Sequence, residues 1–215
     1  SRKLAKLVFN DGCAISIDND EADQFLQSVF NDNKFRKNFG EELEAGYAIG
    51  GLVLRPYVDT KTNKIKISFC RADTFYPLQS NTNDISEAAI ATITQQNEGK
   101  KNVYYTLLEF HEWENSTYYI RNELYRSEEQ SQTGVRVPLP TLDKYKELKE
   151  ETALVGFTRP LFVYIKLAGK NNIDIDSPLS LGIIDNAKRQ LIDINEKYDE
   201  FMNEVEEARR KILAS

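Results

Sequence analysis

The stretch SEAAIATITQQNEGKKNVYYTLLEFHEWENSTYYIRNELYR, residues 86–126, contains three runs rich in β-branched and aromatic residues. A polar connection, NEGKK, separates the first two runs, and a tight polar connection at Asn115 and Ser116 separates the second from the third. β-branched and aromatic residues favour strands, and polar clusters between such runs favour turns. The stretch therefore predicts three consecutive antiparallel strands that form a meander.

The residues before this meander predict a hairpin preceded by helices. The runs LVLRPYV (52–58) and KIKISFC (64–70) flank the polar loop DTKTN, which is typical of a β-hairpin. Upstream, apolar residues recur every three or four positions in a first segment, in a second after Asp20, and in a third that ends at Gly50, as in amphipathic helices. Between the first two of these helices, CAISID (13–18) alternates as a short strand.

The residues after the meander predict a loop at 127–134, a short extended piece, and a short charged helix at LDKYKELKEE (142–151). The stretch GFTRPLFVYIKLAG then contains an eight-residue apolar strand, and a loop rich in Asn and Asp follows it. The predicted class is α+β, with N-terminal helices, a mostly antiparallel sheet and a long C-terminal helix. We divide the chain into a body (1–156) and a second part (157–215) that contains the strand, the polar loop and the helix.

The C-terminal helix is predicted to carry a narrow apolar ridge. Ser177 is a good N-cap and Pro178 a good first helical residue. The apolar residues that follow alternate at spacings of three and four, the heptad pattern of helices that pack on other helices. These residues, called the heptad ridge below, are Ile184, Ala187, Leu191, Ile194, Tyr198, Phe201, Val205, Ala208 and Ile212. On a helix of roughly 50 Å, we expect this ridge to pack on the body or on neighbouring subunits.

No residue pattern in the chain predicts catalysis. The only histidine is His111, and on a strand it shares a face with Glu109 and Trp113. A Glu-x-His pair could offer two ligands to zinc or iron, but no second histidine or suitably placed cysteine completes a site. A packing role for His111 is therefore favoured, and a metal-dependent enzyme built on Glu109 and His111 is the minor alternative. We predict no metal and no cofactor.

The glycines and the basic aromatic residues are also better explained by structure than by ligand binding. Gly46, Gly50 and Gly51 match neither the dinucleotide-binding nor the P-loop pattern and predict helix termination with close backbone packing. Aromatic and basic residues alternate in TYYIRNELYR (117–126), as on surfaces that bind single-stranded nucleic acid. In a meander, cross-strand pairing of these residues is the preferred interpretation.

Composition and charge exclude several classes of protein. A net charge of −6 argues against a protein whose affinity comes mainly from neutralising DNA phosphates, although DNA could pass such a protein without being gripped. Cys13 and Cys70 have no CxxC spacing and predict buried thiols rather than a disulfide or a zinc site. No apolar run approaches the ~20 residues of a transmembrane helix, and no signal peptide is visible. A cytoplasmic protein without a membrane partner is predicted.

Several stretches follow one another along nearly the whole chain in a characteristic order. None of them is a catalytic signature, so their specificity comes from their number and their order. They are LAKLVFNDG, AGYAIGGLVLRPYVD, ISFCRADTFYPLQSNT, YYTLLEFHEW, YYIRNELYR, GFTRPLFVYIKLAGKNNIDIDSPLSLGI and IDINEKYDEFMNEVEEARRKI. In these stretches the chain resembles the portal proteins of tailed bacteriophages, of the type found in siphophages of Gram-positive hosts.

The resemblance implies a structural, minor capsid protein of the virion that is made in the host cytoplasm. Such a protein is a subunit of a ring, usually dodecameric, that forms the head–tail connector at one vertex of the capsid. Double-stranded DNA passes through the ring during packaging and ejection, and the expected partners are other copies of the chain, terminase, capsid proteins and head–tail adaptor proteins. Family chains are longer, so we expect this chain to be a fragment with the wing-like β-rich body and the helix that follows it.

A coiled-coil adaptor is the alternative function that the heptad ridge leaves open. In such a protein the ridge would pair two chains into a dimer.

Overall fold

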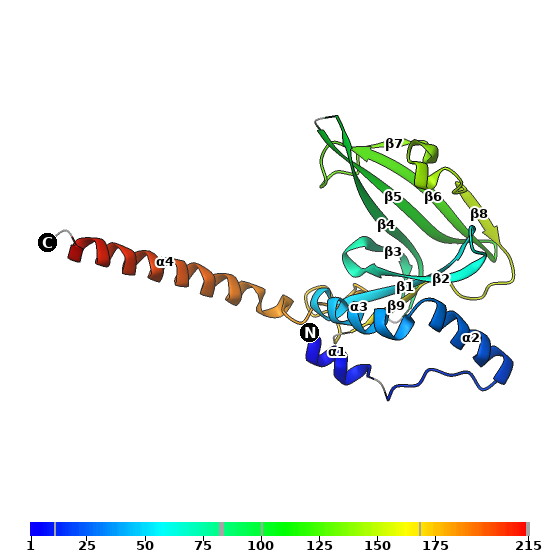
Figure 1. Cartoon of the computed structure of the whole chain (residues 1–215), viewed down its shortest axis with the longest axis horizontal. Coiled ribbons are helices and arrows are strands. Elements are labelled where there is room, and N and C mark those ends of the chain that lie inside the picture. The colour runs from blue at the N-terminus through cyan, green and yellow to red at the C-terminus, as the bar shows by residue number, and fades with distance from the viewer. Residues whose placement is uncertain (11, 82–83, 100, 168, 214–215) are drawn as a thin grey trace.

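The structure is a computed structural model that describes residues 1–10, 12–81, 84–99, 101–167 and 169–213, with side chains up to Arg209. Helices and two antiparallel sheets pack together, and one long helix projects from them (Figure 1). One sheet includes a strand at residues 163–166, so from here on the body means the helices and sheets without the projecting helix. The predicted α+β class, with a long C-terminal helix, is confirmed.

The three predicted N-terminal helices are present as α1 (Arg2–Val8), α2 (Asp20–Asp32) and α3 (Phe35–Ile49). The side chain of Asn19 caps α2 by accepting a hydrogen bond of 2.9 Å from Ala22 N. Gly50 ends α3 in the left-handed conformation, with a φ of 94°, as predicted for that glycine.

The strand predicted at residues 13–18 is wrong. The connection between α1 and α2 is stretched out (Figure 1), but residues 13–18 pair with no strand among the described residues, and side chains from α2 hold their backbone instead. Asp23 accepts a hydrogen bond from Ile17 N, and Gln27 donates one to the carbonyl oxygen of Ile15. The alternation of residues was correct for an extended backbone, but no neighbouring strand is available to complete a sheet.

The predicted hairpin is confirmed as β1 (Gly51–Asp59) and β2 (Lys64–Arg71). A third strand, β9 (Val163–Lys166), pairs with the other edge of β1, so the order of this sheet is β2-β1-β9. The predicted eight-residue strand is thus only four residues long. It is shorter because the chain before Val163 turns inward, and Phe162 is buried in the core rather than paired in the sheet.

The second sheet contains the predicted meander, β4 (Ile85–Glu98), β5 (Lys101–Glu114) and β6 (Thr117–Ser127). It is six-stranded, with the order β3-β4-β5-β6-β7 and with β8 also paired to β6. The added strands are β3 (Phe75–Ser80), β7 (Val135–Val137) and β8 (Glu151–Leu154). A 3₁₀ turn at Ala72–Thr74 joins the two sheets.

The charged helix predicted at 142–151 is wrong. The chain there forms the 3₁₀ turns Leu139–Thr141 and Asp143–Tyr145 and then enters β8. Packing overrides the local helical preference, because Leu142 is fully buried against the sheet and Leu148 packs beside it. The side chain of Asn122 also holds this segment, through a hydrogen bond of 2.9 Å to the carbonyl oxygen of Lys149.

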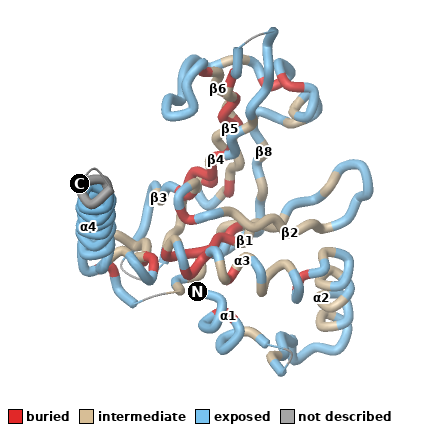
Figure 2. The backbone as a smooth tube through the Cα atoms, turned by 60° about the vertical axis from the view of Figure 1, so that its left-hand side comes forward, coloured by how far each residue is buried: buried red, intermediate tan, exposed pale blue. Residues whose placement is uncertain are grey.

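The core lies mainly against one face of the meander, where Figure 2 shows buried residues along β4, β5 and β6. One cluster joins the strands to the 3₁₀ turns and contains Val103, Tyr105, Leu107, Leu124, Leu139 and Leu142. A second joins the two sheets and contains Val53, Phe75, Ala88, Ile90 and Phe162. A third joins α1 to α3 through Ala5, Leu43 and Tyr47.

The C-terminal helix α4 (Lys188–Leu213) begins later than the predicted start at Pro178. The residues before it bind β9 and the end of α3 instead of forming helix. Ser180 N donates to the Tyr164 hydroxyl on β9, and Ile183 N donates to the carbonyl oxygen of Tyr47 on α3. A Cβ at Gly182 would lie 2.1 Å from the carbonyl oxygen of Ala48, so this close approach requires glycine.

Candidate functional site

The heptad ridge is an apolar feature that the body leaves uncovered. Its residues Leu191, Ile194, Tyr198, Phe201, Val205 and Ala208 lie on α4 and are exposed, with 62% of Ile194 and 58% of Phe201 accessible. Ile184 and Ala187 precede the helix, at the 3₁₀ turn Asp185–Ala187, and the side chain of Ile212 lies outside the described residues. Contiguous exposed apolar surface of this kind marks an interaction site.

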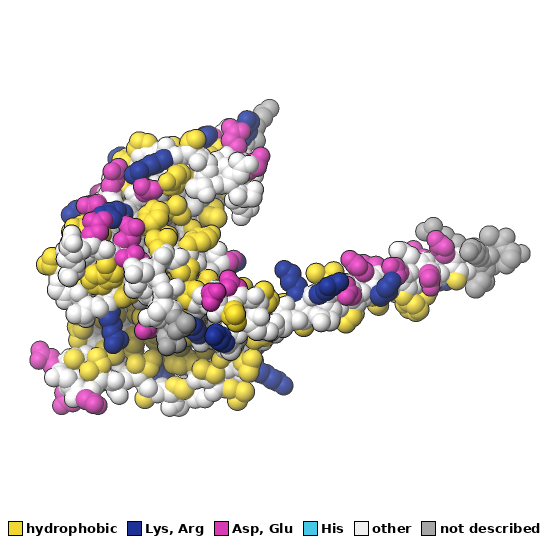
Figure 3. All heavy atoms as spheres, turned by 180° about the vertical axis from the view of Figure 1, so that it is seen from behind, with side chains coloured by type: hydrophobic (Ala, Val, Ile, Leu, Met, Phe, Trp, Pro, Cys, Tyr) yellow, Lys and Arg dark blue, Asp and Glu magenta, His cyan; other side chains and the backbone are white. Residues whose placement is uncertain are grey.

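The helix that carries the ridge extends away from the body for its whole length (Figure 1). It has 26 residues and is about 39 Å long, shorter than the predicted length because it starts at Lys188. Figure 3 shows hydrophobic side chains along one edge of the projecting helix and charged side chains along the other. Such a helix has too little contact with its own body to be stabilised by it, and so it suits a partner.

Basic residues flank the ridge, and acidic residues lie away from it. In the heptad, the positions next to the ridge hold Lys188, Lys197 and Arg209, with Glu204 as the one acidic residue among the described side chains there. Lys197 also forms an ion pair of 2.6 Å with Glu200 on the same helix. The remaining acidic residues of the helix point elsewhere: Asp193, Glu196, Asp199, Glu200, Glu206 and Glu207. A partner that covers the ridge would therefore meet a basic border.

Glu109 and His111, the only candidates for chemistry, are buried in a hydrogen-bonded network. His111 lies 2.7 Å from Glu109 through Nε2 and 2.6 Å from the Tyr118 hydroxyl through Nδ1. The Arg55 guanidinium donates to both carboxylate oxygens of Glu109, and Leu161 N donates to the Tyr118 hydroxyl at 2.9 Å. If Tyr118 donates in turn to His111 Nδ1, the proton on Nε2 points to Glu109 and all the partners are satisfied.

The network perturbs the ionisation of its buried members. Burial raises the pKa of the Glu109 carboxyl, but the hydrogen bond from His111 and the positive charge of Arg55 outweigh it and hold that pKa below its usual value. Burial also raises the pKa of the Tyr118 hydroxyl far above its usual range. Glu109 is therefore an ionised carboxylate paired with a guanidinium at neutral pH, and Tyr118 is a neutral donor.

The network joins the two sheets rather than forming a reactive site. Arg55 lies on β1 of the three-stranded sheet, while Glu109, His111 and Tyr118 lie on the meander. No group of three or more metal-ligating side chains occurs in the part of the chain that the structure describes. The packing role predicted for His111 is confirmed by its burial and its two hydrogen bonds. Sequence reasoning missed Arg55, although a lone arginine inside the apolar run LVLRPYV signals a buried partner.

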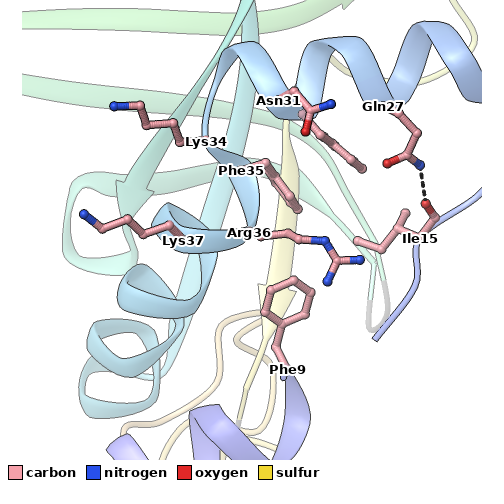
Figure 4. Close-up of a pocket in the computed structure, with 9 residues that line it drawn as sticks. Phe9, Ile15, Gln27, Asn31, Lys34, Phe35, Arg36 and Lys37 are labelled. Carbon is pink, nitrogen blue, oxygen red and sulfur yellow. Dashed lines mark hydrogen bonds between the residues drawn. The ribbon is translucent and has the colours of Figure 1, made fainter. Parts of the chain in front are cut away.

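A pocket of about 240 Å³ lies between α2, α3 and the extended segment at residues 13–18 (Figure 4). Phe30 and Phe35 stack beside it with their ring centres 4.2 Å apart. Arg36 donates a hydrogen bond of 2.7 Å to the carbonyl oxygen of Cys13, while Lys34 and Lys37 point away from the other labelled side chains. The polar side chains that line the pocket, Arg36 and Gln27, thus hold the extended segment in place.

The basic residues of the meander form cross-strand pairs, as predicted. Arg121 binds Glu112, Glu114 and Glu151 at 2.7–2.8 Å, and Arg126 binds Glu98 at 2.6 Å.

The prediction of buried thiols is wrong for both Cys13 and Cys70, which are free and only partly buried. Cys13 lies in the extended segment, and Cys70 lies near the end of the edge strand β2, where it packs against the cluster that joins the two sheets.

The described residues thus form packed sheets with a projecting helix. A family model described as "Phage portal protein, SPP1 Gp6-like" matches residues 1–215. The chain belongs to this family of phage portal proteins. A search of curated proteins finds no match.

Membership gives this portal protein a general role. Portal proteins are structural, generally non-enzymatic components of the virion capsid that assemble into oligomeric rings and act as head–tail connectors in DNA packaging. No described helix of this portal protein is long and apolar enough to cross a membrane.

Proposed function

We propose that this chain forms part of the wall of a dodecameric portal ring, the channel at a capsid vertex through which double-stranded DNA is packaged and ejected. In this role the ring docks terminase on the packaging motor side and head–tail adaptor proteins on the tail side, and it contacts the surrounding capsid proteins. The ring is assembled in the host cytoplasm and remains in the virion. The observation that carries the proposal is the family match over residues 1–215.

Two physical features of the chain support this role. A closed ring needs head-to-tail contacts between different surfaces of identical subunits, and the exposed heptad ridge offers one such surface. The net charge of −6 suits a channel that lets DNA slide, because a strongly basic wall would bind the phosphates.

The test is to replace Leu191 and Phe201 together with Asp in the portal protein. We expect rings to disappear from electron micrographs and the mass from light scattering to fall to that of one chain. Burying each apolar side chain in the interface contributes about 1.5–3 kcal/mol to binding. The double substitution removes this contribution and places unpaired charges in every interface of the ring. Both side chains are exposed in the single chain, so its fold should survive.

A matched control places the same residue type on the opposite side of the helix, through Arg189→Asp with Asn203→Asp. This control should still form rings. Rings that persist in the Leu191→Asp, Phe201→Asp protein would show that the ridge is not an assembly surface.

The exposed heptad spacing also favours the second candidate, a coiled-coil adaptor. An adaptor would give a dimer whose mass does not increase further with concentration, whereas a portal protein gives a ring. A monomer at every concentration would exclude the adaptor.

A further inference from the structure

One face of the six-stranded sheet is apolar and is only partly covered by the rest of the chain; we call it the open face. Tyr76 pairs with Ala89 and Ala89 with Phe110, while Ala91 pairs with Leu108 and Ile93 with Thr106, so these side chains share a face. It is the face opposite to the core, because the core residues occupy the alternate positions of the same strands. The apolar residues of this open face are Tyr76, Ala89, Ala91, Ile93, Leu108 and Phe110.

The open face is hollowed where a loop borders it. Residues 130–133 line a groove of about 360 Å³ together with Tyr76, Ala91, Ile93 and Leu108. Tyr76 is 52% exposed and Ile93 is 46% exposed. Among the residues that the structure describes, no α-helix packs extensively on β4 or β5. Ala89 and Ala91 at its floor are buried, so the apolar surface that the single chain leaves accessible is at the rim, on Tyr76 and Ile93.

Acidic residues dominate the charge on this face. Two arginines are present, Arg121 and Arg136, and each is already bonded to carboxylates. The carboxylates that share the face outnumber them: Glu112, Glu114, Glu123 and Glu151. This surplus of negative charge is complementary to the basic border of the heptad ridge at Lys188, Lys197 and Arg209.

The two surfaces also match in length. Strands β4 and β5 have 14 residues each, which corresponds to about 46 Å. Helix α4 is about 39 Å long, so it can lie along the sheet without overhanging it. It points away from its own body, so the sheet that it can cover belongs to another copy (Figure 1).

We propose that α4 of one portal subunit packs on the open face of the six-stranded sheet of the next subunit, with the heptad ridge in the groove beside Ile93 and Leu108. The contact rests on the proposed ring and specifies how its subunits join. It is head-to-tail, since a helix on one side of the chain meets a sheet on the other, and such contacts form a ring when the rotation between successive subunits closes. The aromatic side chains of Tyr198 and Phe201 fill the groove, where large apolar groups contribute most to binding.

Thiol cross-linking between two differently marked variants tests this contact. In a background with Cys13→Ser and Cys70→Ser, Ile93→Cys is placed in one portal protein and Phe201→Cys in a second, larger tagged one. Mixed subunits treated with a short thiol cross-linker should give a product that joins residue 93 of one copy to residue 201 of the other, identified by mass spectrometry. Its yield should exceed several-fold that of a control with Glu200→Cys, which lies away from the ridge.

The outcomes separate this contact from the proposed function. Rings that form without a 93–201 product, or that give only 201–201 products from helices paired with each other, overturn the contact and leave the portal ring standing. A protein that remains monomeric and gives no cross-link contradicts both.

Discussion

Replacing Glu109 with Ala tests whether the buried network holds the two sheets together. The side chain of Glu109 is only 6% exposed, and its removal leaves the Arg55 guanidinium, which is 22% exposed, and the His111 Nε2 without their acceptor. Breaking a buried ion pair from one side costs about 3–5 kcal/mol, because the remaining charge loses its partner while most of it stays out of water. The melting temperature should then fall by about 6–20 °C for a chain of this size.

Urea unfolding followed by tryptophan fluorescence measures this loss directly. The only tryptophan, Trp113, lies 4.8 Å from the Tyr118 ring, next to the network, and so reports on its disruption. The matched control is Glu114→Ala, which removes an exposed carboxylate from Arg121 and should change the free energy of unfolding by less than about 1 kcal/mol. A Glu109→Ala protein as stable as this control would refute the assignment of the network as the link between the sheets.

The ion pair between Glu109 and Arg55 also makes the free energy of unfolding depend on pH, in a direction that the pKa of Glu109 defines. The pKa of Glu109 is lower in the folded than in the unfolded chain, so its contribution to stability is fully present above its unfolded value, about 4.3. The contribution is lost as the pH falls through the folded pKa. The difference in unfolding free energy between the native protein and Glu109→Gln should therefore be constant from about pH 6 to 8 and shrink below about pH 4. A difference that grows on acidification would contradict the direction of the shift.

Two further substitutions test how the elements are joined. Gly50→Ala should destabilise the fold by more than about 1 kcal/mol in urea unfolding. The φ of Gly50 is 94°, and the new Cβ would lie 2.2 Å from the carbonyl oxygen of Ser180. The control Gly99→Ala should cost less, because Gly99 has a φ of 68° but faces open space among the described atoms. Asn33→Ala should lower the free energy of unfolding by about 1–3 kcal/mol and speed amide hydrogen exchange in β2. The Asn33 side chain accepts a 3.0 Å hydrogen bond from Ile67 N of that strand and donates another to the carbonyl oxygen of Ile65. Unchanged exchange in β2 would contradict this role.

The sequence predicted the elements whose signals are local. The meander and the hairpin follow from runs of strand-forming residues with polar turns between them, and the N-terminal helices follow from apolar periodicity. The predictions failed where contacts distant in the sequence decide the backbone. The segment at 142–151 looks helical by its charges, yet burial of Leu142 and the bonds from Asn122 draw it onto the sheet.

The prediction of where the long helix starts failed for the same reason. Ser177 and Pro178 form a good local start signal, but Ser180 and Ile183 bind the end of α3, more than a hundred positions earlier in the chain. The heptad ridge could be predicted because its spacing is local. The network of Arg55, Glu109 and His111 could be predicted only in part, because the sequence places Glu109 and His111 on one face but gives no pairing between β1 and the meander.

The position of this network gives it a role in the proposed ring as well as in the fold. Helix α4 leaves the body next to α3 and the three-stranded sheet, whereas the open face that receives a neighbour's helix belongs to the six-stranded sheet. A load applied to the ring must therefore cross from one sheet to the other within each subunit, and the bond between Arg55 and Glu109 lies on that path. Glu109→Gln keeps the shape of the side chain but removes its charge, so rings should dissociate at a lower urea concentration, as measured by light scattering. Glu114→Gln should leave that concentration unchanged, and rings of the Glu109→Gln protein as resistant as the native ones would show that the load passes elsewhere.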